Sequence, residues 1–217
     1  MSANRHDFFR LWLILLILLL VTLYPAWWWL GGAEWVLRGL RLMANALLPH
    51  FFSQGISEVT LLANQSWKVL TGLNVEDSHP AETAIFFITE KHLLRSVMGF
   101  PLLWALLLAT PGSGLKRLVW GTLLLGLISL LGLAGHMWAT IGVMVNHQPS
   151  SIDENLVPPP YRVSGVPYSE WLFHLSGFAH YLEAVIVPII APVLIWVLLC
   201  PRGVMRLVVS VRRRIRR

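Results

Sequence analysis

Four long apolar stretches dominate the pattern of this chain, and they predict four membrane-spanning helices. Each stretch is long enough to cross a hydrocarbon core at a helical rise of about 1.5 Å per residue. The stretches are residues 11–30, 93–110, 118–145 and 171–199. The first ends in Trp27, Trp28 and Trp29 and exceeds the apolar run of a signal peptide. We therefore expect it to remain as an uncleaved span with an interfacial tryptophan anchor.

Small residues and prolines distinguish the last two spans. Glycine recurs through the third span, at Gly121, Gly126, Gly132, Gly135 and Gly142. Small residues let helix backbones approach closely in lipid, so we expect this span to pack tightly against a neighbour. Pro188 and Pro192 lie inside the fourth span. Each removes a backbone hydrogen bond, which predicts a kink.

The segment between the first two spans, residues 31–92, has a different pattern. Residues 34–48 carry an apolar stripe at helical spacing, and this helix either lies along the membrane surface or packs on the rest of the segment. Short runs rich in β-branched and aromatic residues then predict strands at 58–63, 67–71 and 83–89. Breaks between them are expected at Gln65-Ser66, Gly72 and residues 77–80.

These elements define the expected fold class. We predict an α-helical polytopic membrane protein of four transmembrane helices, with a small α+β periplasmic domain between helices 1 and 2. The remaining segments are an N-terminus, a short loop, a longer loop and a basic tail. They comprise residues 1–10, 111–117, 146–170 and 200–217.

Composition supports a membrane protein and excludes several other classes. The chain has 217 residues, of which 56% are hydrophobic and 13% charged. Soluble domains carry about 25% charged residues, so a soluble enzyme or a disordered chain is excluded. The single cysteine, Cys200, excludes a disulfide scaffold and a CxxC metal or redox motif.

The distribution of positive charge predicts the orientation. Eleven of the 17 Lys and Arg residues lie in segments 1–10, 111–117 and 200–217, whereas segments 31–92 and 146–170 hold five. Positive charge marks the cytoplasmic side of a membrane. We therefore expect both termini in the cytoplasm and the folded segments outside, in the periplasm if the membrane is a bacterial inner membrane.

A polar cluster is expected near the outer ends of spans two, three and four. The topology brings Arg95, His136, His180 and Glu183 to one level, close to His92, Ser96 and His174. Ionisable groups in spans are costly and often functional. The cluster could hold a substrate head group, a metal ion or a partner's residue, although a structural lock between helices is the favoured interpretation. His180 and Glu183 have a metal-ligand spacing, but two ligands do not make a site, so no metal site is predicted.

The sequence contains none of the common motifs of catalytic or cofactor-binding sites. The chain has no GxSxG elbow, no phosphate-binding glycine loop and no HExxH motif. Cys200 lies at the cytoplasmic end of span four, far from every histidine. We expect no catalytic residue, no cofactor and no nucleic-acid partner.

The basic tail predicts contact with anionic lipids of the cytoplasmic leaflet, where each arginine contributes about 1 kcal/mol. Its alternation of basic and apolar residues fits a surface-bound amphipathic helix as well as a plain topology anchor. The candidate lipid contacts are Arg202, Arg206, Arg212, Arg213, Arg214, Arg216 and Arg217.

Three stretches of the chain resemble a bacterial family of small membrane proteins associated with exosortases. They are residues 85–88 (IFFI), 99–111 (GFPLLWALLLATP) and 188–196 (PIIAPVLIW). Exosortases are similar to membrane transpeptidases that use Cys, Arg and His near the outer face to process C-terminal sorting signals. Because this chain has no cysteine on that side, the resemblance implies a companion of the enzyme rather than the enzyme.

The resulting hypothesis is a non-enzymatic inner-membrane accessory protein with a membrane-protein partner in a surface-protein sorting system. One alternative is a structural subunit of a conjugation, secretion or pilus machine. A second alternative is a small membrane enzyme or transporter that uses the His and Glu residues.

Overall fold

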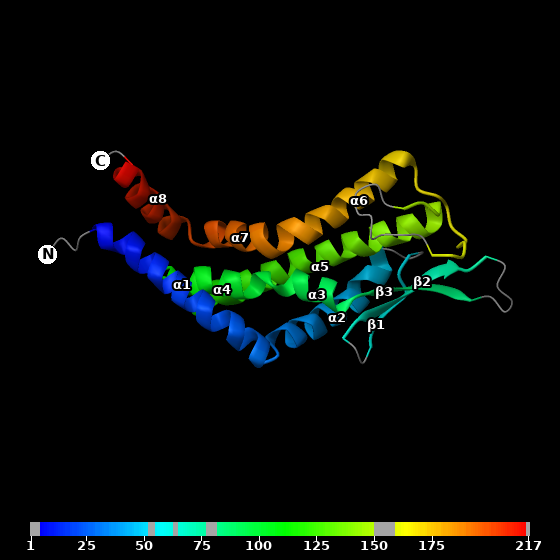
Figure 1. The fold of residues 1–217 in the computed structure, drawn as a ribbon, viewed down its shortest axis with the longest axis horizontal. Helices are drawn as coiled ribbons and strands as arrows, with labels where there is room; N and C mark the ends of the chain where they lie inside the picture. Colours follow the sequence, from blue (N-terminus) through cyan, green and yellow to red (C-terminus); the bar gives the residue numbers. More distant parts are fainter. Residues whose placement is uncertain (1–4, 52–54, 63–64, 77–81, 150–158, 216–217) are drawn as a thin grey trace.

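The structure is a computed structural model that describes residues 5–51, 55–62, 65–76, 82–149 and 159–215. Helices dominate these residues, and one small sheet accompanies them (Figure 1). The helices are α1 (Arg5–Trp29), α2 (Gly32–Phe51), α3 (Glu90–Val97), α4 (Gly99–Ala109), α5 (Leu115–Asn146), α6 (Glu170–Val185), the π-helix η1 (Ile186–Ile190), α7 (Ala191–Leu199) and α8 (Pro201–Ile215). The strands are β1 (Glu58–Leu61), β2 (Trp67–Asn74) and β3 (Thr83–Ile88).

Within the described residues, four helical segments are long and apolar enough to cross a membrane, in agreement with the four candidate spans of the sequence. They are Phe9–Trp29, Glu90–Ala109, Leu115–Asn146 and Glu170–Leu199. The second is longer than expected because the helix begins in a polar turn before the apolar run, as α3, and continues as α4. The protein is therefore a mainly helical, multi-pass membrane protein with a small sheet.

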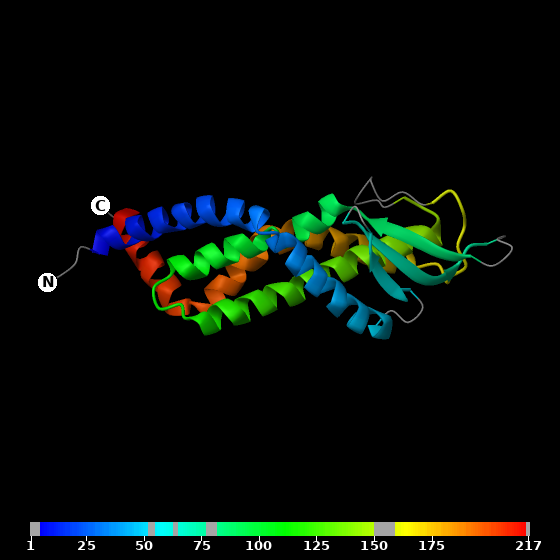
Figure 2. The ribbon, with the colours of Figure 1, turned by 90° about the horizontal axis from the view of Figure 1, so that it is seen from below.

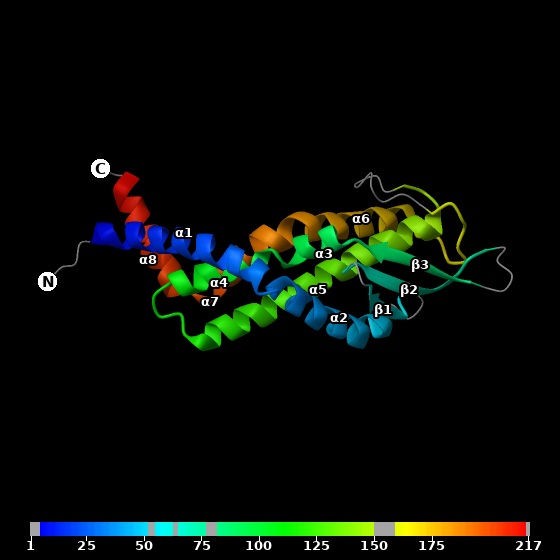
Figure 3. The same ribbon diagram turned by 60° about the horizontal axis from the view of Figure 1, so that its bottom comes forward.

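The molecule is elongated, with different structures at its two ends. Both termini lie at one end, and the sheet lies at the other (Figures 1 and 2). Helix α5 runs from the bundle to the sheet end with α6 beside it, and α3 joins them next to β3 (Figure 3). At 1.5 Å per residue, the 32 residues of α5 span about 48 Å, which exceeds the thickness of a hydrocarbon core, about 30 Å. Helix α5 therefore has enough length to project beyond the bilayer.

Glycines on α5 let it approach α6 closely. A Cβ atom at Gly132 would lie 2.6 Å from Cγ of Glu183, and one at Gly135 would lie 3.2 Å from Cβ of Ala179. Near the outer end, a Cβ atom at Gly142 would lie 2.9 Å from the Tyr168 ring. The predicted tight packing of this span is thus present, and it depends on positions where a methyl group does not fit.

The fourth span departs from α-helical geometry where its prolines occur. Residues Ile186–Ile190 form the π-helix, with Pro188 inside it and Pro192 just after it. The span bends at this point (Figure 1). A Cβ atom at Gly99 would lie 2.9 Å from Cγ of Pro192 and 3.0 Å from the Pro188 carbonyl oxygen. The start of α4 therefore packs directly on the irregular turn.

The three strands form an antiparallel sheet in the order β1-β2-β3. Strand β2 does not end before Gly72, as expected from the sequence, but continues to Asn74. Its register with β3 shifts between Leu70 and Asn74, so the glycine occupies an irregular stretch of the strand rather than terminating it. Beyond β2, Val75 forms a bridge with Val163 of the loop before α6.

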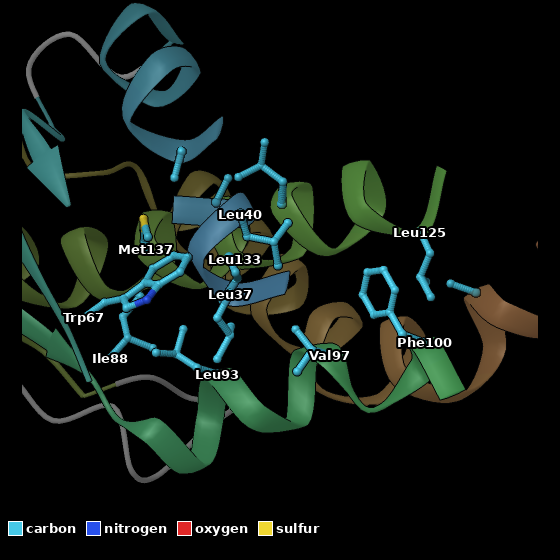
Figure 4. Close-up of a cluster of buried hydrophobic side chains, with 14 of the residues drawn as sticks. Leu37, Leu40, Trp67, Ile88, Leu93, Val97, Phe100, Leu125, Leu133 and Met137 are labelled. Carbon is cyan, nitrogen blue, oxygen red and sulfur yellow. The ribbon is translucent and has the colours of Figure 1, made fainter. Parts of the chain in front are cut away.

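Helix α2 packs inside the protein through its apolar stripe. Ala33, Leu37, Leu40, Ala44 and Leu48 are all at most 4% exposed. Figure 4 shows Leu37 and Leu40 meeting Trp67 of β2, Leu93 of α3 and Met137 of α5. These contacts favour the packed-helix interpretation of residues 34–48 over a helix held only by the membrane surface.

Asn45 connects α2 to the edge of the sheet. Its Nδ2 donates to the Val59 carbonyl at 2.9 Å, and its Oδ1 accepts from the Val59 N–H at 2.7 Å. The side chain thereby satisfies both backbone groups of an edge-strand residue, which would otherwise be open for pairing.

The C-terminal tail is helical and packs partly on the protein. Leu207 of α8 is buried, and α8 contacts α1. The side chains of Arg202 and Arg206 are exposed. Arg212, Arg213 and Arg214 lie on α8, but their side chains are outside the described part of the chain, as are Arg216 and Arg217 altogether.

Candidate functional site

Polar residues from three helices meet inside the bundle between α3, α5 and α6. We call His92, Ser96, His136, His180 and Glu183 the His–Glu cluster. At 1.5 Å per residue, its histidines lie about 26–31 Å from the helix ends near the termini: His92 from the end of α4, His136 from the start of α5, and His180 from the end of α7. This distance is close to the thickness of a hydrocarbon core, which is about 30 Å.

Glu183 is the most deeply buried charged group of the cluster, at 1% exposure. Its Oε1 accepts a short hydrogen bond from the Ser96 hydroxyl, and its Oε2 lies 2.9 Å from Nε2 of His92. The His92 N–H is not aligned with that oxygen, so the pair makes an electrostatic contact without a well-formed hydrogen bond. A carboxylate removed from water in this way needs positive charge or further donors near it.

The three histidines stack against one another. The ring centroids are 4.1 Å apart for His92 and His136, 5.6 Å for His92 and His180, and 4.6 Å for His136 and His180. Nδ1 of His136 lies 2.8 Å from Nδ1 of His180, so one of these nitrogens carries the proton of that hydrogen bond. One nitrogen from each of the three rings can be chosen such that all three lie within 4.8 Å of one another.

Helical spacing explains how each helix presents its part of the cluster. On α3, His92 and Ser96 are four residues apart and point inward, while Leu93 and Val97 form the adjacent apolar face (Figure 4). On α5, Gly132 lies one turn before His136 and leaves the space that Glu183 fills. On α6, His180 and Glu183 are three residues apart, as expected from the sequence.

The structure brings together three of the four residues predicted from the sequence. His136, His180 and Glu183 are buried in the cluster, whereas Arg95 is exposed. Arg95 turns outward because His92 and Ser96, together with Leu93 and Val97, already occupy the inward face of α3. The Glu183 carboxylate contacts His92 and Ser96, which were expected near the cluster but were not among its four predicted residues.

Nucleophilic chemistry is not favoured by this geometry. The Ser96 hydroxyl donates to the Glu183 carboxylate rather than to a histidine nitrogen, and Ser96 is only 1% exposed. Cys200 is buried at the other end of the bundle, where its Sγ lies 3.9 Å from Nη1 of Arg117. The cluster is suited instead to sharing protons, to binding a cation, or to locking the three helices together.

Tyr168 packs at the sheet end of the α5–α6 contact. Its backbone N–H donates to Oδ1 of Asn146 at 2.8 Å, and its carbonyl accepts from Nδ2 of Asn146 at 3.1 Å. Burial raises the pKa of Tyr168 to about 12, although a side-chain hydrogen bond with Trp138 acts in the opposite direction. The phenol therefore stays neutral well beyond physiological pH.

A cavity of about 270 Å³ lies between α2 and the β1–β2 hairpin. Acidic, basic and apolar side chains line this cavity. They are Glu34, Leu37, Arg38, Arg41, Leu61, Leu62, Gln65 and Trp67. Arg38 pairs with Glu34 at 3.6 Å, while Nε of Arg41 and Nε1 of Trp67 are buried without a hydrogen-bond partner. Two arginines and one glutamate supply the charged side chains of this lining, so the cavity fits an anionic group by charge.

Comparison with known proteins agrees with the resemblance noted from the sequence. No curated protein and no solved structure matches the chain. A family described as exosortase H-associated membrane protein matches residues 6–203, which include all four spans, the sheet and the His–Glu cluster. This match covers most of the chain and confirms the predicted family, so the protein belongs to the exosortase H-associated membrane protein family.

Proposed function

We propose that the protein is a non-enzymatic accessory protein of a bacterial inner membrane that assists an exosortase-type surface-protein sorting system through its periplasmic face. The observation that carries this proposal is the family match over residues 6–203, because the family is described by its association with an exosortase. A membrane-protein partner follows directly from that association.

The proposed orientation places both termini in the cytoplasm. It is supported by the eleven basic residues of segments 1–10, 111–117 and 200–217 and by the position of both termini at one end of the molecule (Figure 1). The sheet, the cavity and the His–Glu cluster then face the periplasm. The arginines of the tail lie at the cytoplasmic leaflet, where anionic lipids attract them.

The partner is proposed to contact the sheet end of the molecule. Arg95 is exposed beside the His–Glu cluster, and Arg38 and Arg41 line the cavity with Glu34 as the one acidic side chain. An acidic segment of the partner would fit this cavity by charge.

Purification from the native membrane in mild detergent tests this function. We expect an exosortase to co-purify with the wild-type protein and to be lost, at least in part, from Arg41→Glu. Arg162→Glu makes the same charge change at an exposed position of the same end, outside the cavity, and should retain the partner.

Other outcomes of the same experiment identify the alternatives. Recovery within a large secretion, conjugation or pilus particle without an exosortase would replace the proposal with a structural-subunit function. A protein recovered alone that shows activity lost in Glu183→Gln would establish an enzyme or transporter instead.

A further inference from the structure

We infer that His92, His136 and His180 form a binding site for a divalent transition-metal ion of the zinc class, with Glu183 as the carboxylate that compensates its charge. This inference does not rest on the proposed function. It rests on the convergence of three imidazoles from helices that are distant in the sequence.

The ligand set fits this class of metal. Neutral imidazole is a preferred ligand of Zn²⁺ and of other late first-row divalent ions. Three histidines are also the protein ligands of a common type of zinc site, in which a fourth position remains for water or a partner group. One nitrogen from each of His92, His136 and His180 lies within 4.8 Å of the others, so a modest movement of the side chains would bring all three to a single ion.

The imidazole rings have to shift to reach coordination geometry, by up to about 1.5 Å for a nitrogen pair at the 4.8 Å limit. Around a tetrahedral zinc with Zn–N bonds of about 2.0–2.1 Å, two ligand nitrogens lie about 3.3 Å apart. Nδ1 of His136 and Nδ1 of His180 are 2.8 Å apart, so this pair needs to separate by about 0.5 Å. Rotation of the imidazole rings supplies such a movement without a change in the helix backbones.

The charges of the cluster favour a cation. Glu183 is 1% exposed, and its Oε2 has no aligned hydrogen bond although Nε2 of His92 lies 2.9 Å away. A dication bound by the three neutral imidazoles would offset this buried negative charge. The Glu183–His92 contact then resembles the carboxylate–histidine–metal arrangement that orients a ligand and raises its basicity.

The position of the site determines which ligand an entering ion meets first and which helices the bound ion would connect. The His92 side chain is 15% exposed, whereas His136 and His180 are buried, so His92 is the most accessible ligand. An ion bound there would connect α3, α5 and α6 at the level where these helices meet the sheet end. Metal binding would therefore stabilise the face that we propose meets the partner.

Metal binding by the purified full-length protein tests the inference. The protein should carry a tag without histidine, and bound metal should be measured before and after removal by a chelator. We expect one equivalent of zinc per chain and, with Co²⁺ as a probe, the intense visible bands of a four-coordinate nitrogen site. Saturation with zinc should raise the midpoint of thermal unfolding by about 5–10 °C.

Variants identify the ligands. Loss of a residue that supports a ligand costs about 10–100-fold in metal affinity, so we expect that range for Glu183→Gln and a larger loss for His136→Ala or His180→Ala. His174→Ala is the matched control, because His174 is an exposed histidine on the same helix as His180. This variant should bind zinc as the wild type does.

The wild-type titration keeps the inference falsifiable even if a histidine variant fails to fold. Substoichiometric zinc after titration, or weak Co²⁺ bands of a six-coordinate site, would overturn it. Loss of zinc from His174→Ala with retention in folded His180→Ala would overturn it as well.

Discussion

The contact between Gly132 and Glu183 provides a direct test of how the cluster is packed. A Cβ atom at residue 132 would lie 2.6 Å from Cγ and 3.2 Å from Cβ of Glu183, and 3.1 Å from Cγ2 of Val187. Glu183 cannot move away freely, because Ser96 and His92 hold its two oxygens. In Gly132→Ala, the helices therefore have to separate or the carboxylate has to leave its partners.

The size of this effect follows from overpacking. Extra methyl groups in a packed interior cost about 1–3 kcal/mol. Gly126→Ala is the matched control, because it makes the same change on the same helix and its Cβ would meet nothing within 4 Å. Replacing a helical glycine by alanine without a clash is favourable by about 0.8–1 kcal/mol, so Gly126→Ala should be as stable as the wild type or more stable.

Thermal unfolding of the purified protein in detergent measures the difference. A destabilisation of 1 kcal/mol lowers the midpoint by about 2–4 °C in a chain of this length, so Gly132→Ala should unfold about 2–12 °C below Gly126→Ala. Equal midpoints for Gly132→Ala and Gly126→Ala would refute the close α5–α6 packing at the cluster.

Three further predictions concern other parts of the fold. Glu183→Ala removes the acceptor of the buried Ser96 hydroxyl and should destabilise the protein by about 1–3 kcal/mol, whereas Glu183→Gln, which keeps the shape, should cost less; equal midpoints for the two variants would contradict a stabilising role of the cluster. Asn45→Ala removes both hydrogen bonds to Val59 and should increase amide hydrogen exchange across Glu58–Leu61; unchanged exchange would contradict the edge-capping role. The pKa of Tyr168 is raised above its unfolded value of 10.0 to about 12, so its contribution to stability is present below pH 10 and lost as pH rises toward 12. A tyrosinate absorbance titration of Tyr168→Phe should lack the late step that the wild type shows. A Tyr168 step at pH 10 would contradict the burial of this phenol.

The four candidate spans could be predicted from the sequence because bilayer thickness imposes a strong constraint on span length. The length of the first run distinguished a span from a signal peptide, and the β-branched and aromatic residues indicated strands near the positions of β1, β2 and β3. Strand β2 was ended too early at Gly72, because a glycine in an irregular stretch of strand has the same local signal as a turn.

The cluster was only partly predictable, because the rotation of each helix is set by packing. His180 and Glu183 share a face by spacing alone, and His136 followed from the level of the spans. The choice between Arg95 and His92 depended on which face of α3 turns inward, and Leu93 and Val97 provide that information only when their helical neighbours are known. The His92–Ser96 spacing beside the apolar face of Leu93 and Val97 was the sequence signal that could have indicated which side of α3 faces the cluster.

Crosslinking in the native membrane tests most directly the claim that the sheet end of this protein meets an exosortase. A photoreactive residue in place of Arg95 would probe the exposed position beside the His–Glu cluster, and one in place of Ile17, which is 53% exposed on α1, would serve as the control. We expect an exosortase adduct from position 95 and none from position 17. An adduct from position 17 alone, or from neither position in membranes that contain the exosortase, would contradict the account.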